Sequence, residues 1–218
     1  GMAVILDVVY NHATGAHPYA AMYWDGANNK TASNNPWFNV DAPHQWSVYH
    51  DWNHSNPMVR EHVKRNLTYL MTEYKVDGFR FDLTKGFTQN SGTESYDQSR
   101  VDIIKEYNAH IQSIDDDAVM ICEHFVDDEN WELGKDGIKV WRNMNHPYIK
   151  AMKRDMSVAD FTGTTNTFND SGMMGDWQTF GQYVGYQESH DEQRTNYEGQ
   201  WDYNGASIDF ATRMERAK

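Results

Sequence analysis

Five short apolar segments, each followed by polar residues, constrain the fold of this chain more than any other feature. They span residues 2–9, 76–82, 118–122, 138–141 and 183–187. A continuous apolar run such as 2–9 is typical of a strand buried on both faces of a parallel sheet. Segments with helical spacing separate the runs, and this alternation predicts a parallel sheet with right-handed crossovers. We therefore expect an α/β fold, either a (β/α) barrel or a doubly wound sheet.

The helices between these strands are predicted from caps and periodicity. Asn56 and Pro57 form a helix start, because Asn caps the first turn and Pro fits its first position. Apolar residues at helical spacing predict that this helix runs to Tyr74 and that a second covers Val101 to Ile114. Further helices are expected from Pro147 and over 206–217. The predicted loops are 84–94, 131–137 and 162–177.

Residues 13–56 form a long insertion without helical periodicity. The segment is rich in Asn, Gly and Pro and holds several Trp and Tyr residues. A loop of this length in a compact domain is either functional or a small subdomain. Aromatic faces pack in a core or stack on sugar rings. We expect most of these side chains in a core of the segment's own, with two or three meeting a ligand.

The stretch Val76–Asp82 brings an arginine and a carboxylate together at a strand end. Arg80 and Asp82 are two residues apart, so both project from the same face of the strand. An arginine beside an aspartate holds the carboxylate ionised and fixed, as a carboxylate nucleophile requires. A structural ion pair is the alternative interpretation. Gly78 would let a neighbouring backbone come close.

Polar residues follow four of the five predicted strands. The carboxyl ends of parallel strands meet on one rim, where barrels and doubly wound sheets keep their active sites. Buried charges must be paired or absent, so core filling does not explain this set. Its members are Asp7, Asn11, His12, Arg80, Asp82, Glu123, His190 and Asp191.

Three other kinds of site fit the sequence less well. His50 and His54 have a zinc-like spacing but lie in the insertion, without the helix or third ligand that zinc requires. Cys122 lies inside a predicted strand, and no Gly-x-Ser-x-Gly motif indicates a serine nucleophile. No Gly-x-Gly-x-x-Gly follows the first strand, which argues against a dinucleotide fold. Chemistry carried out by carboxylates remains.

Composition narrows the choice of partners. The net charge of −13 argues against nucleic acid and anionic membranes, and is compatible with a neutral, polyhydroxylated substrate. No run of about 18 apolar residues exists, so no membrane span is expected. The single cysteine rules out an intramolecular disulfide.

Four motifs carry a family resemblance. Asp7-Val8-Val9-Tyr10-Asn11-His12, Gly78-Phe79-Arg80-Phe81-Asp82, Glu123 and His190-Asp191 occur in order on predicted strand ends. Together they resemble the ordered motifs of the α-amylase family, glycoside hydrolase family 13. The resemblance implies a partial (β/α)8 TIM barrel, about strands 3 to 7, over 1–218, with 13–56 as an inserted, subdomain B-like segment.

The resemblance also implies roles for individual residues. In the family pattern Asp82 would be the nucleophile, Glu123 the general acid/base and Asp191 a stabiliser of the transition state. Six further residues would contact or support the bound sugar: Asp7, Tyr10, His12, Arg80, Lys85 and His190. Asn11 matches a frequent ligand of a structural calcium ion, which the inserted segment often helps to bind. Ser189, Cys122 and Gly86 depart from the usual pattern.

The function implied is a retaining α-glucan hydrolase, active in starch degradation and carbohydrate metabolism. A glucanotransferase, a pullulanase-type relative and a catalytically silent glucan-binding module remain alternatives. The preference for α-1,4 or α-1,6 linkages, the balance of hydrolysis and transfer, and the oligomeric state stay open. The family favours a secreted, periplasmic or cell-surface protein. We expect a chain truncated at both ends and inactive alone, because it begins in a strand and ends in a helix.

Two expectations concern geometry. Asp82 and Glu123 would end adjacent strands, which lie about 4.8 Å apart. That spacing permits the carboxyl separation of about 5–5.5 Å found in retaining glycosidases. Asp191 would face both across the sugar site. We also expect the pKa of Glu123 to be raised, partly by the negative charge of Asp82.

Overall fold

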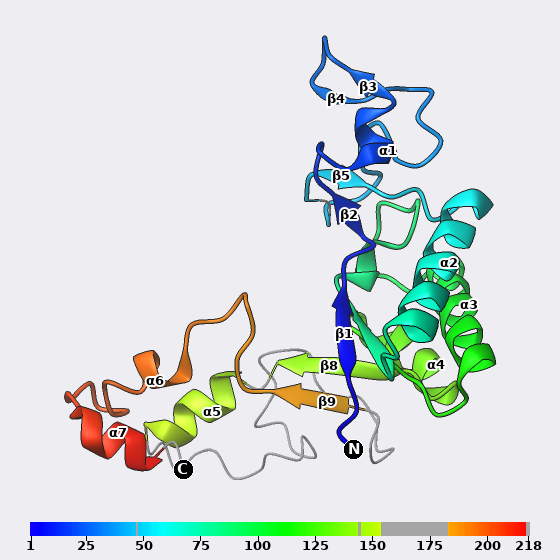
Figure 1. Ribbon diagram of the computed structural model, residues 1–218. Coiled ribbons are helices and arrows are strands. Elements are labelled where there is room, and N and C mark those ends of the chain that lie inside the picture. The colour runs from blue at the N-terminus through cyan, green and yellow to red at the C-terminus, as the bar shows by residue number, and fades with distance from the viewer. Residues whose placement is uncertain (47, 144, 154–182, 217–218) are drawn as a thin grey trace. The chain divides into compact units, whose positions relative to one another are not determined.

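A computed structural model describes residues 1–46, 48–143, 145–153 and 183–216 (Figure 1). The chain divides into two compact units, Gly1–Val140 and Trp141–Lys218. The strands of the described residues are β1 Ile5–Val8, β2 His12–Ala13, β3 Trp24–Asp25, β4 Lys30–Thr31, β5 His50–Asp51, β6 Gly78–Phe81, β7 Val119–Cys122, β8 Lys139–Asn143 and β9 Tyr183–Tyr186. The helices are α1 Pro18–Ala21, α2 Pro57–Glu73, α3 Gln98–Ile114, α4 Asp127–Lys135, α5 Asn145–Met152, α6 Thr195–Glu198 and α7 Phe210–Arg216, with a 3₁₀ turn, η1, at Thr84–Gly86.

The predicted sheet forms, with strand order β1-β6-β7-β8-β9. β1, β6, β7 and β8 pair in parallel, so their carboxyl ends lie at one edge. Phe81 of β6 is in register with Val8 on one side and Cys122 on the other. Asp82 and Glu123 each follow directly, so the prediction that they end adjacent parallel strands is confirmed.

Close approach of β6 and β7 depends on a glycine, as predicted. A Cβ on Gly78 would overlap the carbonyl oxygen of Val119. Any other residue would therefore push these strands apart. The glycine therefore permits the pairing of Gly78 with Val119 at the start of β6.

The expectation that the first strand is buried on both faces is wrong for this structure. β1 begins at Ile5 rather than Met2, and only Val8 of its residues is buried. Met2 and Val9 are 92% and 49% exposed. Because β1 is the edge strand of the described sheet and pairs with β6 alone, its outer side has no neighbour.

The main core lies between the sheet and two long helices. α2 begins at the predicted cap, where the Asn56 side chain accepts a hydrogen bond from the Met58 N–H. α3 is capped in the same way by Asp97. The apolar stripes of α2 and α3 pack against β6 and β7, and Leu67, Phe79, Phe81, Tyr107 and Ile111 are fully buried there.

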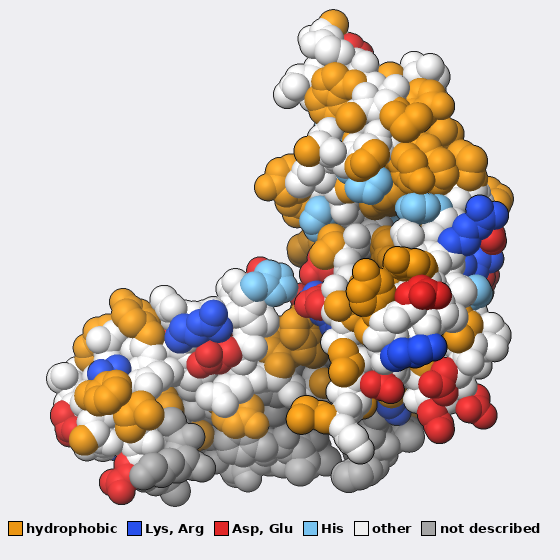
Figure 2. Space-filling model, in the orientation of Figure 1, with side chains coloured by type: hydrophobic (Ala, Val, Ile, Leu, Met, Phe, Trp, Pro, Cys, Tyr) orange, Lys and Arg blue, Asp and Glu red, His pale blue; other side chains and the backbone are white. Residues whose placement is uncertain are grey.

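Residues 13–56 fold around their own aromatic cluster. β2 pairs with β5 and β3 with β4, both antiparallel. Phe38 and Trp52 are buried, and Trp37 stacks on Tyr19 with ring centroids 4.3 Å apart. Figure 2 shows further hydrophobic side chains gathered on the surface of the part that carries α1 and these two small sheets. This segment belongs to the same compact unit as β1, β6 and β7.

Several predicted boundaries need correction. The loop expected over 131–137 is mostly helix, because α4 covers Asp127–Lys135 and is anchored by buried Val126, Glu129 and Leu133. α5 begins at Asn145 rather than Pro147, and α7 begins at Phe210 rather than Ala206. The predicted loop 162–177 lies outside the described residues. None of the helices in the described part combines the length and apolar character needed to cross a membrane.

Candidate active site

Arg80 is the centre of the polar cluster at the carboxyl edge of the sheet. Its Nη1 lies 2.8 Å from Asp7 Oδ1 and 2.8 Å from Asp82 Oδ1, and its Nη2 lies 2.9 Å from Glu123 Oε2. Arg80, Asp82 and Glu123 are all buried, whereas Asp7 is exposed. One guanidinium thus serves three carboxylates from three adjacent strands. The ion pair expected between Arg80 and Asp82 is present.

The chain turns sharply after β6 and wraps the Glu123 carboxyl. Leu83 has a left-handed backbone with φ 45°, uncommon for a residue with a branched side chain. This turn aims the Leu83 N–H at Glu123 Oε2, 3.0 Å away, and the Thr84 N–H at the Glu123 carbonyl, 2.9 Å away. Both ends of Glu123 are thereby fixed by the loop that follows Asp82.

The pKa of Glu123 is raised to about 7. Burial is the largest cause, and the negative charge of Asp82 adds to it, while Arg80 and the Leu83 N–H act in the opposite direction. The expected direction and the expected contribution of Asp82 are confirmed, and burial is a cause that the sequence did not indicate. A carboxyl with this pKa is protonated in a substantial fraction of molecules near neutral pH, as a general acid requires.

Residues after β1 approach the same cluster. His12 is half-buried, with its Nδ1 3.3 Å from the Asn11 side-chain nitrogen. Burial lowers the pKa of His12, although the charges of Asp82 and Asp51 oppose this. Tyr10 is oriented toward the core, where burial raises its pKa to about 12 and its ring lies 6.0 Å from that of Phe81. A sugar contact for Tyr10 therefore stays a prediction.

Lys85 is held in place from two sides. Its Nζ lies 2.6 Å from Glu94 Oε1 and 4.4 Å from the centre of the Trp46 ring. The side chain is only 5% exposed. The contact with Trp46 connects the inserted segment to the loop after β6.

Behind this loop lies a buried ionic network that the sequence did not reveal. Arg100 of α3 pairs with Glu129 of α4, with Nη2 and Oε1 2.5 Å apart, and His124 Nε2 lies 2.7 Å from Glu129 Oε2. Arg100 also donates to the carbonyl of Lys85, and His124 Nδ1 lies 3.0 Å from the Thr84 hydroxyl. The side chains of Arg100, His124 and Glu129 have no exposed surface. The network therefore supports the loop that holds Glu123 and Lys85.

Asp191 and His190 belong to the second unit, in the turn after β9. Both side chains are exposed, and His190 Nε2 lies 3.4 Å from Asp191 Oδ2. Ser189, which departs from the family pattern, has its hydroxyl near the backbone N–H of Asp191, at 3.2 Å. That Asp191 faces Asp82 and Glu123 stays a prediction.

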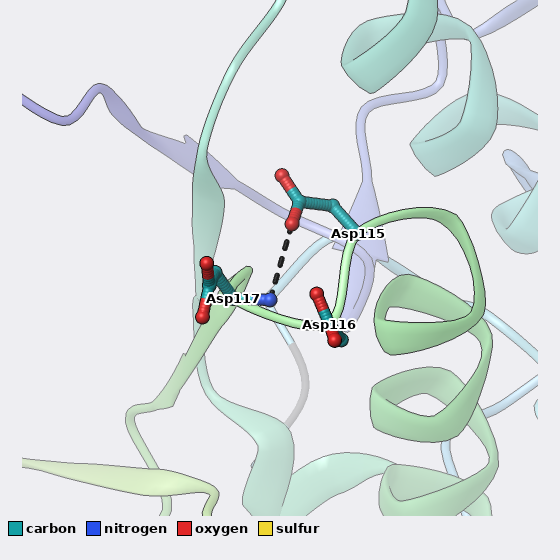
Figure 3. A group of neighbouring side chains, drawn as sticks. All are labelled: Asp115, Asp116 and Asp117. Carbon is teal, nitrogen blue, oxygen red and sulfur yellow. Dashed lines mark hydrogen bonds between the residues drawn. The ribbon is translucent and has the colours of Figure 1, made fainter.

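Metal-like groupings in the described residues are weak. His54, considered above for zinc, is buried and satisfied in the core by the Tyr107 hydroxyl and the Tyr10 carbonyl. Asp115, Asp116 and Asp117 lie close together in the turn between α3 and β7 (Figure 3). All three are exposed, and Asp115 Oδ1 accepts the Asp117 N–H at 3.1 Å. This geometry is that of a solvated turn.

The calcium ligand implied by the resemblance, Asn11, lies in a buried polar pocket. Its Nδ2 donates to the Trp46 carbonyl at 2.9 Å, while its Oδ1 is buried without a hydrogen-bond partner. His44, from the inserted segment, places its Nε2 2.8 Å from the Gly86 carbonyl oxygen and 3.3 Å from Asp51 Oδ1. In the structure the His44 imidazole therefore joins the inserted segment to the loop after β6.

Two half-open pockets in the described residues lie away from the carboxylates. One of about 380 Å³ is bordered by Lys30, Asp41 and Tyr49, and another of about 320 Å³ by Arg60, Asn90 and Glu106. Neither is lined by Asp82 or Glu123.

No family model matches the chain. Comparison with known proteins finds similar sequences among enzymes named α-amylase and isoamylase. Alpha-amylase 3 of Dictyoglomus thermophilum is 26% identical over 180 residues, covering 72% of this chain and 34% of its own length. The chloroplastic isoamylase 3 of Oryza sativa subsp. japonica is 36% identical over 92 residues, covering 38% of this chain and 11% of its own. The chain thus spans about a third or less of these relatives.

Solved structures share the fold. The crystal structure of PulA from Klebsiella oxytoca superposes with a TM-score of 0.63 at 18% identity, covering 99% of this chain and 25% of that one. At 18% identity this similarity supports a shared fold and no shared function. The parallel strands described above correspond to part of a TIM barrel.

Proposed function

The chain belongs to the α-amylase family, glycoside hydrolase family 13, and from this premise we propose that it carries the central part of the active site of a retaining α-glucan hydrolase. The observation that supports the proposal most strongly is the arrangement of Asp82 and Glu123. They end adjacent parallel strands and bind the same guanidinium, and the pKa of Glu123 is raised to about 7. Two carboxyls with divided roles are the basis of glycoside hydrolysis.

In the proposed reaction Glu123 gives its proton to the glycosidic oxygen as the bond to the leaving sugar breaks. An oxygen of Asp82 attacks the anomeric carbon and forms a covalent ester with the sugar. Water then attacks the same carbon, Glu123 takes a proton from it, and the Asp82 carboxylate is released. Each step inverts the anomeric centre, so the product retains the α configuration.

Neighbouring residues would divide the remaining tasks. Arg80 fixes Asp82 Oδ1, so that the carboxylate approaches the sugar in one orientation. Asp7 shares that guanidinium and supports the site from β1. Lys85 and His12 would bind sugar hydroxyls beside the two carboxyls. Asp191 and His190 would complete the sugar site in the proposed enzyme.

A stereochemical experiment tests the proposal. The full-length protein would be incubated with a soluble α-glucan, and the first product followed by proton NMR before mutarotation. We expect the α-anomer. First-formed β-anomer would overturn the nucleophile role of Asp82, and binding of glucan without any turnover would favour a silent glucan-binding module.

Cleavage at α-1,6 branch points is a second candidate, favoured by the isoamylase relative, which has the higher identity over its shorter matching stretch. Product profiles on amylose and pullulan distinguish the two. Short maltooligosaccharides from amylose would indicate α-1,4 cleavage, whereas maltotriose from pullulan would indicate α-1,6 cleavage. Products longer than the substrate would instead reveal glucan transfer.

A further inference from the structure

The pocket around Asn11 is where a calcium ion is expected from the family resemblance, but its contacts do not fit one. Calcium takes six to eight oxygen ligands at about 2.3–2.6 Å. The contacts around Asn11 in the described residues include four such oxygens: Asn11 Oδ1, Asp51 Oδ1 and the carbonyls of Gly86 and Trp46, the last of which already accepts from the Asn11 amide. The other oxygen of Asp51 is already bound by the Asn39 amide at 2.6 Å. This set is too small for calcium.

The centre of the pocket is filled by a side chain. His44 Nε2 lies 2.8 Å from the Gly86 carbonyl oxygen and 3.3 Å from Asp51 Oδ1. A carbonyl oxygen can only accept, so the hydrogen on His44 Nε2 must point toward Gly86. The side chains of His44 and Asp51 are 0% and 1% exposed, which makes this a dry contact between a donor and oxygen acceptors.

The residue after Lys85 permits this arrangement. A Cβ at Gly86 would overlap Asn11 Oδ1 and stand 3.0 Å from His44 Cε1. Any larger residue at that position would therefore displace the imidazole or the Asn11 amide. The departure from the family pattern at Gly86 and the placement of His44 are thus two parts of one packing arrangement.

We propose that the His44 imidazole replaces the structural calcium ion in joining the inserted segment to the loop after β6. His44 attaches the segment through Gly86, and Asp51 lies beside it on β5. The same segment supplies Trp46, whose ring lies over Lys85. His44 is therefore a positioning residue for Lys85, and the fold of this region does not require calcium. The inference does not depend on the proposed catalytic roles.

Thermal unfolding of the full-length protein in EDTA and in calcium chloride tests the proposal. We expect any change in Tm on adding calcium to be the same in wild type and Asp51→Asn. His44→Ala should lower Tm by roughly 3–6 °C in both buffers, because it leaves buried acceptors without a donor. His44→Gln should recover part of the loss, since its amide can donate from nearly the same place. His50→Ala, in the same segment but outside this pocket, is the matched control.

Calcium titration by calorimetry separates the outcomes where a variant fails to fold. A calcium-binding event in wild type that disappears in Asp51→Asn would overturn the proposal, because it would locate an ion in this pocket. Equal Tm for His44→Ala and wild type would overturn it as well. Binding that persists in Asp51→Asn belongs to another part of the protein and supports the assignment here. None of these readings depends on glucan turnover.

Discussion

The pKa values of two buried glutamates six residues apart, Glu123 and Glu129, are shifted in opposite directions. Burial raises the pKa of Glu123 to about 7. Burial acts the same way on Glu129, but its bonds with His124 and Arg100 outweigh burial and lower its pKa. Both carboxyls contact an arginine, Glu123 at 2.9 Å and Glu129 at 2.5 Å. Proximity to an arginine therefore does not decide the protonation of a buried carboxyl.

The difference lies in how each arginine is shared. Arg80 is divided among Asp7, Asp82 and Glu123, so negative charge exceeds positive charge around Glu123. Arg100 and His124 both point at Glu129, and the remaining donors of Arg100 bind the Lys85 and Ser95 carbonyls. The first cluster leaves a carboxyl able to exchange a proton. The second satisfies its charges and fixes the backbone beneath the site.

The largest expected effect comes from removing the carboxylates of the first cluster. Asp82→Asn and Glu123→Gln should each lower kcat by roughly 10³-fold or more, because one removes the nucleophile and the other the acid. Stability should change little, since both replacements preserve shape and reduce buried negative charge. Glucan hydrolysis and urea unfolding of the same preparations would check both. Wild-type turnover in either variant would contradict the assignment.

Breaking the second cluster should instead have its main effect on stability. Arg100→Met leaves the Glu129 carboxylate buried without its arginine partner, and loss of one member of a buried pair costs about 3–5 kcal/mol of unfolding free energy. Urea unfolding measures the loss. The double variant Arg100→Met, Glu129→Gln removes the unpaired charge and should recover part of it. No recovery would show that packing of Arg100, rather than its charge, matters.

Glu129 also predicts how stability depends on pH. Its pKa is lowered in the folded state, from an ordinary value of 4.5. A depressed carboxyl stabilises the fold above its unfolded pKa, and the contribution is lost as the pH falls through the folded value. The stability difference between wild type and Glu129→Gln should thus be full at neutral pH and shrink below about pH 4.5. A difference that stays constant down to pH 3 would contradict this.

The raised pKa of Glu123 predicts a loss of activity at high pH, whereas the lowered pKa of Glu129 predicts a loss of stability at low pH. Because only the protonated acid can donate, kcat should fall as the pH rises above about 7, tenfold per unit on the alkaline limb. In Asp82→Asn the adjacent negative charge is gone, so the pKa of Glu123 should move downward. NMR titration of ¹³C-labelled glutamate would follow both glutamates in one sample. A Glu123 midpoint unchanged by Asp82→Asn would show that burial alone sets it.

Local patterns predict most of the first cluster. Arg80 and Asp82 share one strand, and Glu123 ends the next, so alternation along the strand and parallel register bring them together. The second cluster has no such signal, because Arg100 and Glu129 are 29 residues apart on two helices. Glu129 lies in α4, whose start, Asp127-Asp128, carries the acidic residues favoured at helix N-termini. That signal was available, but burial of Glu129 follows from tertiary packing.

The pocket at His44 shows a second limit. The position of Gly86 could be read from the sequence, yet nothing in the spacing predicted that a histidine 42 residues earlier would bind its carbonyl. The insertion lacks periodicity, so the fold of 13–56 depends on aromatic contacts among residues distant in sequence. The edge position of β1 likewise depends on its neighbours, which its apolar composition does not specify.

The smallest expected effect comes from a third ion cluster, which lies on the surface. Glu106 of α3 lies 2.9 Å from Arg60 Nε and 2.9 Å from Lys64 Nζ, both on α2. These distances match those of the Arg80 cluster, but the three side chains are 22–35% exposed. Solvent screens such pairs, so Glu106→Gln should cost only about 0.5–1 kcal/mol of unfolding free energy, and less in high salt. Urea unfolding at two salt concentrations, with Asp41→Asn of the more exposed Lys30–Asp41 pair as the control, would measure this. A loss as large as that of Arg100→Met would mean that helix packing, not burial of charge, distinguishes the clusters.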